Sequence, residues 1–292
     1  MKRESFGSRL GFILVSAGCA IGIGNVWKFP YICGAYGGAA FILIYLCFLV
    51  ILGIPVLVAE FAVGRGSHTS VAKCFDKLAP AGSGWKPLKF IGIIGCYMLM
   101  MFYTTVGGWM LYYCVKSLRG DFVGATPEAV TQSFSDMLGN APTMMLWMVI
   151  ICLIGFAVCF MGLQNGIEKI SKVMMSALLI IMVILAVHSV MMEGAGEGIR
   201  FYLIPDFQKI KEAGVGNVVF AALSQSFFTL SIGIGAMLIF GSYLDKSRSL
   251  TGEAVSITVL DTFVALTAGF IIIPACFSYG IQPDAGPSLI FI

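Results

Sequence analysis

Charged residues and histidines are scarce in this chain. Asp, Glu, Lys and Arg make up 11% of its 292 residues, against roughly 25% in an average soluble domain, and only 2 residues are histidines. Hydrophobic residues reach 59%, and the mean hydropathy is +0.94. A soluble core cannot bury that much apolar surface, so the composition predicts a protein that is surrounded by lipid.

The sequence also lacks the signatures of enzymes, disulfide frameworks and nucleic-acid binding. It contains neither a His-Glu-x-x-His nor a Gly-x-Ser-x-Gly motif, which disfavours an intramembrane enzyme. The 9 cysteines are scattered in apolar stretches, with neither disulfide nor metal-ligand spacing. The net charge is only +3, and no basic run interleaved with aromatic residues indicates a nucleic-acid partner. Hydropathy alone leaves a transporter, a channel and a membrane scaffold open.

The chain does have a series of long apolar runs. About 20 apolar residues in a helix cross about 30 Å of hydrocarbon, and lipid cannot satisfy backbone polar groups, so each run predicts a helix. None shows the alternation of a membrane β-barrel. Between them we expect a short interfacial helix within 66–80 and longer loops at 120–140 and 193–212. The predicted spans are 10–34, 38–63, 89–115, 142–163, 169–192, 215–242 and 254–279.

Basic residues predict the orientation of these spans. If the N-terminus lies inside, most Lys and Arg residues fall in inner segments, as the positive-inside rule requires. We therefore expect a multi-pass protein of the plasma membrane (the inner membrane of a bacterium) with a cytoplasmic N-terminus. The inner segments then hold Lys2, Arg3, Arg9, Arg65, Lys73, Lys77, Lys86, Lys89, Lys169, Lys172, Lys246 and Arg248, and the outer segments Lys116, Arg119, Arg200, Lys209 and Lys211.

Three charged residues fall inside the predicted spans, namely Lys28, Glu60 and Asp261. Each costs about 2.5–3.5 kcal/mol or more at a helix centre that faces lipid. We therefore expect each to face protein or water, and functional groups should lie near them.

Two of the spans have sequences that disfavour an unbroken helix. Glycines 18, 22 and 24 precede Asn25, and Pro30 follows within the same span; segment 225–236 repeats the theme with Ser231, Gly233 and Gly235. Broken helices at corresponding places in two halves of a chain indicate a transporter binding site, where unwound carbonyls ligate a cation. The alternative for either motif alone is helix packing, because Gly18 and Gly22 form a GxxxG pattern.

At these positions the sequence resembles the neurotransmitter:sodium symporter family, whose bacterial amino-acid transporters of the LeuT type have such broken helices. The stretch from Gly24 to Tyr31 is highly specific, and the resemblance runs through the whole chain. The other matching stretches are Arg9 to Phe12, Gly37 to Phe41, Gly53 to Val56, Glu60 to Arg65, Tyr103 to Trp109, Gly162 to Lys169 and Gln225 to Gly235.

The resemblance implies an all-α integral membrane bundle of the LeuT inverted-repeat type, with the spans at 10–34 and 215–242 broken mid-membrane. Residues 1–292 then form a single transmembrane domain that is incomplete at its C-terminus. Residues 1–192 are the first five-helix repeat, and 215–279 are the first two helices of the second. We expect the chain alone to be inactive in transport, since later helices of the family complete its sites. A non-transporting membrane scaffold is the alternative, and the oligomeric state is not predicted.

The function that the resemblance implies is sodium-coupled symport of an amino acid by alternating access. Its Na⁺ sites fall on hard oxygen ligands, which suit a small cation. A second Na⁺ site has only part of its ligands in this chain. The first site comprises the Ala20 carbonyl, the Asn25 side chain, Thr229 through its carbonyl and hydroxyl, and Asp261; the second takes the carbonyls of Gly18 and Ile21.

The implied substrate is a zwitterion. Its carboxylate is expected at the backbone near Gly22 and Gly24 and at the Tyr103 hydroxyl. Monoamine transporters of the family carry Asp at the position of Gly22, so glycine favours an amino acid. The amino group is expected among the carbonyls of Ala20, Phe228 and Thr229, and Leu99, Phe228, Ser231 and Ile234 should line a pocket for a hydrophobic or aromatic side chain.

Asp261 is also where the resemblance predicts independence from chloride. Chloride-dependent relatives carry Asn at this position and bind the anion beside it. Tyr45, Gln225 and Thr229 are the expected neighbours of that site. A fixed carboxylate there is expected to replace the anion, with proton exchange as a further possibility; the alternative is that Asp261 only ligates sodium.

The resemblance also places two gates and one supporting residue. Lys28 occupies the outer-gate position where the family usually has Arg, and Lys forms a point-charge pair without Arg's bidentate fork. Arg3, Phe6 and Tyr243 match the inner gate. Glu60 is expected to accept hydrogen bonds from N–H groups freed by the break at 225–236, and a salt bridge to Lys28 is the alternative.

Overall fold

The computed structural model describes residues 6–283, which are almost entirely helical. The first membrane segment is broken. Helix α1 (Arg9–Ala20) begins at Ser8, whose side chain accepts the Gly11 N–H. A π-helical turn, η1 (Gly24–Lys28), leads into α2 (Phe29–Ala35), and the two halves meet at 56°. A bend of this size matches the helix-breaking glycines between Gly18 and Gly24.

The remaining spans follow in the predicted order. Of the described residues, five helices are long and apolar enough to cross a membrane, and the bent pair makes a sixth. The predicted span at 215–242 is a short helix, a break and a further short helix. The elements are α3 (Ala39–Phe48), η2 (Leu49–Gly53) and α4 (Ile54–Ser67), α6 (Leu88–Arg119), α8 (Ala141–Phe160), η3 (Leu163–Glu168) with α9 (Lys169–Val190), α12 (Val215–Thr229), α13 (Ala236–Gly241) and α14 (Leu250–Tyr279).

Between the spans lie short helices as well as loops. A short helix, α5 (Val71–Leu78), is present within 66–80 as expected. The expectation of loops at 120–140 and 193–212 was wrong, because these segments form α7 (Pro127–Gly139), α10 (Ala195–Leu203) and α11 (Phe207–Ala213). The prolines and glycines that suggested loops lie at helix starts: Pro127 follows the capping Thr126, which accepts the Ala129 N–H.

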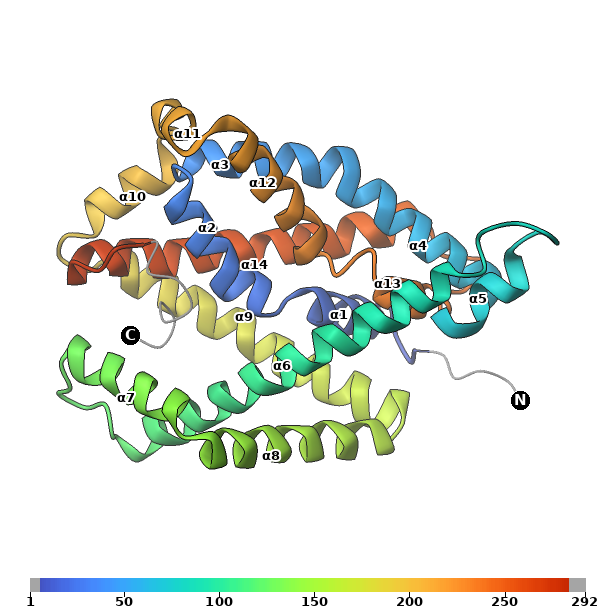
Figure 1. Cartoon of the computed structure of the whole chain (residues 1–292), viewed down its shortest axis with the longest axis horizontal. Coiled ribbons are helices and arrows are strands. Elements are labelled where there is room, and N and C mark those ends of the chain that lie inside the picture. The colour runs from blue at the N-terminus through green and yellow to red at the C-terminus, as the bar shows by residue number, and fades with distance from the viewer. Residues whose placement is uncertain (1–5, 284–292) are drawn as a thin grey trace.

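Helix α14 is the centre of the bundle. It runs along the middle of the molecule in Figure 1 and packs against α1, α2, α4, α9 and α10. Asp261 lies at its middle and is fully buried. By contrast, α8 lies along one edge in Figure 1 and packs against α6, and no residue of α8 is buried within the described chain. The buried polar residues Asn25, Thr229 and Asp261 lie where η1, α12 and α14 meet.

Candidate functional site

At the break in the first span, the backbone N–H and C=O groups leave the regular hydrogen-bonding pattern of an α-helix. Helix α1 ends at Ala20, and Ile21 has extended backbone angles. The chain resumes with the Gly22 carbonyl accepting both the Asn25 and Val26 N–H groups. At Gly24 a Cβ atom would lie 2.8 Å from the Phe228 ring, so glycine lets the two broken segments approach closely.

The break between α12 and α13 spans residues 230–235. Its backbone takes positive φ at Ser231 (52°), Gly233 (92°) and Gly235 (78°), which glycine adopts readily and serine rarely. The Ser231 hydroxyl donates to the Cys19 carbonyl at 3.1 Å and so joins the two breaks. The two interrupted helices therefore face each other at their interruptions.

These breaks leave carbonyl oxygens without backbone partners. Within residues 6–283, no main-chain N–H donates to the carbonyl of Ala20 or of Thr229. Buried main-chain carbonyls normally have a partner, and unpaired ones are candidate cation ligands. Both broken helices thus present a carbonyl oxygen that no main-chain N–H within residues 6–283 occupies.

A polar cluster from three elements lies beside these carbonyls. Asn25, Thr229 and Asp261 are each 0% exposed. The Asn25 amide donates to Asp261 Oδ1 at 2.8 Å and to Thr229 Oγ1 at 3.0 Å. The Thr229 hydroxyl donates to Asp261 Oδ2 at 2.8 Å, and Asn25 Oδ1 accepts the Gly22 N–H at 3.2 Å. Residues more than 200 positions apart in the sequence are thus in direct contact.

Gln225 lies next to this cluster and links α12 to the first break. Its amide nitrogen donates to the Gly24 carbonyl at 2.9 Å, whereas its oxygen is buried and has no partner in the described part of the chain. Tyr45 is fully buried and packs on the Phe29 ring with centroids 5.2 Å apart. Sequence reasoning assigned Gln225 to a former anion site and missed its bond to Gly24.

Glu60 supports the second break. One carboxylate oxygen accepts the Gly233 N–H at 2.6 Å, and the other accepts the Leu238 N–H at 3.2 Å. Lys28 instead lies over the Phe228 ring, with Nζ 4.0 Å from the centroid. The ion pairs found within residues 6–283 include neither Glu60 nor Lys28, so the alternative of a salt bridge between them does not hold there.

We expect Glu60→Gln to lower the free energy of unfolding by about 2 kcal/mol, because the neutral amide offers one acceptor where the carboxylate offers two. Thermal unfolding of the purified protein in detergent measures the loss. Glu197→Gln, which changes an exposed carboxylate on α10, is the matched control and should leave the melting temperature unchanged. Equal stability of the two variants would contradict the role given to Glu60.

A cavity of about 490 Å³ opens beside the breaks. Most of its lining is apolar or aromatic, which suits a hydrophobic side chain. All four residues expected in a side-chain pocket take part, together with Tyr103. The lining consists of Lys28, Leu99, Tyr103, Leu223, Ser224, Phe227, Phe228, Ser231, Ile232 and Ile234.

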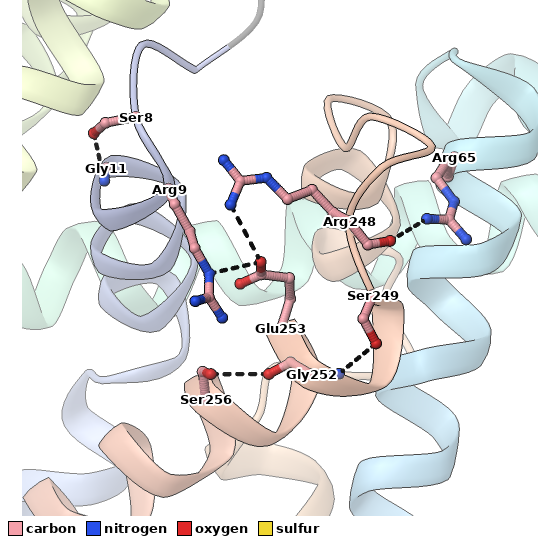
Figure 2. Close-up of polar contacts among 9 residues, drawn as sticks. All are labelled: Ser8, Arg9, Gly11, Arg65, Arg248, Ser249, Gly252, Glu253 and Ser256. Atoms are coloured by element: carbon pink, nitrogen blue, oxygen red, sulfur yellow. Dashed lines mark hydrogen bonds and ion pairs between the residues drawn. The ribbon is translucent and has the colours of Figure 1, made fainter.

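The predicted inner-gate residues are partly within the described chain. The rings of Phe6 and Tyr243 meet edge to face with centroids 5.7 Å apart, whereas Arg3 lies outside the described residues. Figure 2 shows a nearby ion pair that sequence reasoning missed: Arg9 Nε lies 2.9 Å from the buried Glu253 of α14. The sequence feature that could have indicated this ion pair is Glu253, an acidic residue in the first turn of α14.

Gly18 and Ile21 flank Ala20 at the end of α1. A Cβ atom at Gly18 would lie 3.1 Å from the Met175 sulfur of α9, so this turn packs closely against that helix. Ile21 donates its N–H to the Ala17 carbonyl at 2.6 Å. Among the described residues, no hydrogen bond joins Gly18 or Ile21 to Asn25, Thr229 or Asp261.

The sequence and the fold are similar to those of known proteins. The family model described as the sodium:neurotransmitter symporter family matches residues 3–128 and 127–279. The chain is 37% identical to the sodium-dependent transporter YhdH of Bacillus subtilis over 290 residues, which is 99% of this chain and 63% of YhdH. A sodium-dependent transporter of Haemophilus influenzae is 33% identical over 299 residues, which is 99% of this chain and 65% of that protein.

The crystal structure of MhsT in complex with L-phenylalanine is similar over 100% of this chain and 65% of MhsT, with a TM-score of 0.92 and 38% identity. The predicted all-helical bundle of the LeuT type is confirmed by this similarity. The chain therefore spans somewhat less than two thirds of the length of the relatives named here.

Proposed function

Because the chain belongs to the sodium:neurotransmitter symporter family, a transporter family and not an enzyme family, we propose that it carries the ion and substrate sites of a sodium-coupled amino-acid symporter. The substrate is a hydrophobic or aromatic amino acid, which crosses the membrane by alternating access. The observation that supports this most is the meeting of Asn25, Thr229 and Asp261 beside unpaired carbonyls of two broken helices.

The first Na⁺ site is proposed between the Ala20 carbonyl, Asn25, Thr229 and Asp261. All of these supply hard oxygens, and Asp261 brings the negative charge that a buried cation needs. One rearrangement is required, because the Asn25 amide points its nitrogen at Asp261. A half-turn of the amide would present its oxygen to the cation and release the Gly22 N–H.

The released Gly22 N–H is then available to the substrate carboxylate. We place that carboxylate at the backbone of Gly22 and Gly24, with the Tyr103 hydroxyl beside it; a Cβ atom at Gly22 would lie 3.6 Å from that hydroxyl. The amino group lies among the carbonyls of Ala20, Phe228 and Thr229. Sodium and substrate thus share the first break, which couples their binding.

The rest of the substrate occupies the cavity that Leu99, Phe228, Ser231 and Ile234 line. Its volume of about 490 Å³ exceeds that of an aromatic side chain, so the cavity has room for one. L-Phenylalanine is the ligand of the MhsT crystal structure, and it fits the apolar character of this cavity.

A second Na⁺ site takes the carbonyls of Gly18 and Ile21. Lys28 belongs to the outer gate, and Arg3, Phe6 and Tyr243 to the inner gate. With this assignment the N-terminus is cytoplasmic, the location is the plasma membrane, and the chain forms one transmembrane domain with repeats at 1–192 and 215–279.

The test is binding of labelled L-phenylalanine to the purified full-length protein in lipid nanodiscs, with sodium or with choline as the cation. We expect saturable binding in sodium and none in choline. Absence of sodium-dependent binding across the hydrophobic and aromatic amino acids would contradict the proposal and favour a membrane scaffold.

Asp261 is proposed to supply the charge that chloride supplies in chloride-dependent relatives. Replacing chloride by gluconate is therefore expected to leave sodium-dependent binding unchanged in the wild type. The Asp261→Asn variant removes one negative charge beside Gln225, so its binding should need chloride. Chloride titrations of both proteins measure this, and a chloride requirement in the wild type would refute the compensation.

A further inference from the structure

One face of α6 borders the substrate cavity and continues past it to the break between α12 and α13. Leu99 and Tyr103 lie one helical turn apart on this face, and both line the cavity. One turn before Leu99 the same face carries Gly95, and Gly92 lies three residues earlier. The residue that meets both glycines is Ile234, which lies in the break and also lines the cavity.

The contact between Gly95 and Ile234 leaves no room for a side chain on α6. A Cβ atom at position 95 would lie 3.2 Å from Ile234 Cγ2, whereas two carbon atoms in good contact lie about 3.5–4.0 Å apart. At Gly92 a Cβ atom would lie 3.2 Å from the Ile234 carbonyl oxygen. Alanine is more favourable than glycine in the interior of a regular helix such as α6, so the reason for glycine at position 95 is the space that Ile234 occupies.

The backbone around Ile234 is held in place by three other contacts. The Cys96 thiol donates to the Ile234 carbonyl at 3.4 Å, and Glu60 accepts the N–H of the preceding Gly233. The residue that follows Ile234 packs so closely on α5 that a Cβ atom there would lie 2.6 Å from a methyl group of Val71. This backbone therefore cannot retreat from α6, and a methyl group added at position 95 has to displace the Ile234 side chain.

The open space beside the Ile234 side chain is the cavity of about 490 Å³. A side chain that is pushed away from α6 moves into this space, because the close packing elsewhere resists added volume. The volume that it takes is lost to the side chain of the substrate. A large substrate side chain fills the cavity and meets the displaced Ile234, whereas a small one leaves that part of the cavity empty.

We propose that Gly95 determines the largest substrate side chain that the pocket accepts, by setting how far Ile234 extends into the cavity. Gly95 is a positioning residue, since it does not itself line the cavity and acts through Ile234. With glycine at this position the pocket takes aromatic side chains, and with alanine it favours smaller aliphatic ones. The inference rests on the proposed function, because it concerns the pocket for the side chain of that substrate.

Competition against labelled L-phenylalanine in sodium, with the full-length protein in nanodiscs, tests this role. We expect Gly95→Ala to weaken the binding of L-tryptophan about tenfold and that of L-valine less than twofold, since one methylene in a hydrophobic pocket changes discrimination by about tenfold or more. Gly95→Ser places a Cβ atom at the same point and should give the same split. Gly155→Ala is the matched control and should change neither affinity, because a Cβ atom at Gly155 in α8 would meet nothing within 4 Å.

Ile234→Ala identifies the side chain through which position 95 acts. This variant lacks the Cγ2 atom that position 95 contacts, so adding Gly95→Ala to it should change the affinity for L-tryptophan by less than twofold. The proposal is overturned if Gly95→Ala weakens both ligands equally or neither, or if the tenfold loss persists in the Ile234→Ala background. A wild type without sodium-dependent binding would overturn the proposed function and this inference with it, whereas a wild type that binds leaves the variants to decide the role of Gly95 alone.

Discussion

Asn25→Ala is expected to weaken sodium binding by more than about 100-fold and to abolish sodium-dependent binding of L-phenylalanine at ordinary sodium concentrations. The side chain is fully buried, and its amide donates to Thr229 Oγ1 and Asp261 Oδ1. The variant loses one ligand oxygen and leaves an Asp261 oxygen short of a partner. Together these cost about 3 kcal/mol, which corresponds to a factor of about 150.

The measurement is a sodium titration of labelled L-phenylalanine binding, with thermal unfolding as the test of folding. Asn217→Ala is the matched control, since Asn217 lies exposed on α12 and its amide donates to the Ala213 carbonyl. The control should bind as the wild type does. Sodium-dependent binding that survives Asn25→Ala in a folded protein would place the cation elsewhere.

The sequence predicted the parts of the site that depend on backbone chemistry. Clustered glycines with a nearby proline disfavour an unbroken helix, so the breaks at Gly22 and near Ser231 could be foreseen, as could a charged residue such as Asp261 facing inward. Their meeting in space could not be derived from spacing, because Asn25 and Asp261 are separated by more than 230 positions. The family resemblance supplied that step, and the structure places the two side chains in contact.

The sequence-based interpretation was wrong or incomplete where the place of a residue in the fold outweighed its usual local preference. The segment 120–140, where a loop was expected, contains Pro127, and at the first turn of a helix proline is favourable. Gly95 escaped notice because a glycine in an apolar membrane helix usually indicates only helix packing. Its contact with Ile234 of the second break gives it a place behind the pocket, and such an approach is tertiary information.

The same approach of broken helices explains why the first break can serve both ligands. Asn25 faces the carboxylate of Asp261 on one side and the Gly22 N–H on the other. After a half-turn of the Asn25 amide, its oxygen faces a cation on the Asp261 side. Its NH2 group then faces an anionic group on the Gly22 side. A charged side chain introduced at position 22 should therefore determine whether substrates with a carboxylate can bind.

Gly22→Asp is expected to weaken L-phenylalanine binding by at least about 100-fold. The position has room for the side chain, because a Cβ atom there would lie 3.6 Å from the Tyr103 ring and hydroxyl, which is ordinary contact. The effect is therefore electrostatic. Two carboxylates about 4 Å apart repel by about 4 kcal/mol at an effective dielectric constant of about 20, and partial protonation of the new aspartate relieves some of this.

Gly22→Asn separates charge from size, since asparagine has the shape of aspartate without its charge. We expect its affinity for L-phenylalanine to fall by less than about tenfold. The amine 2-phenylethylamine, which lacks the carboxylate, should bind Gly22→Asp at least as well as it binds the wild type, because the aspartate then pairs with a substrate that has no acid group of its own. Competition binding in sodium compares the three proteins with both ligands. If Gly22→Asp weakened the amino acid and the amine equally, the substrate carboxylate would not lie at the first break, and the loss would have to come from distortion of that break.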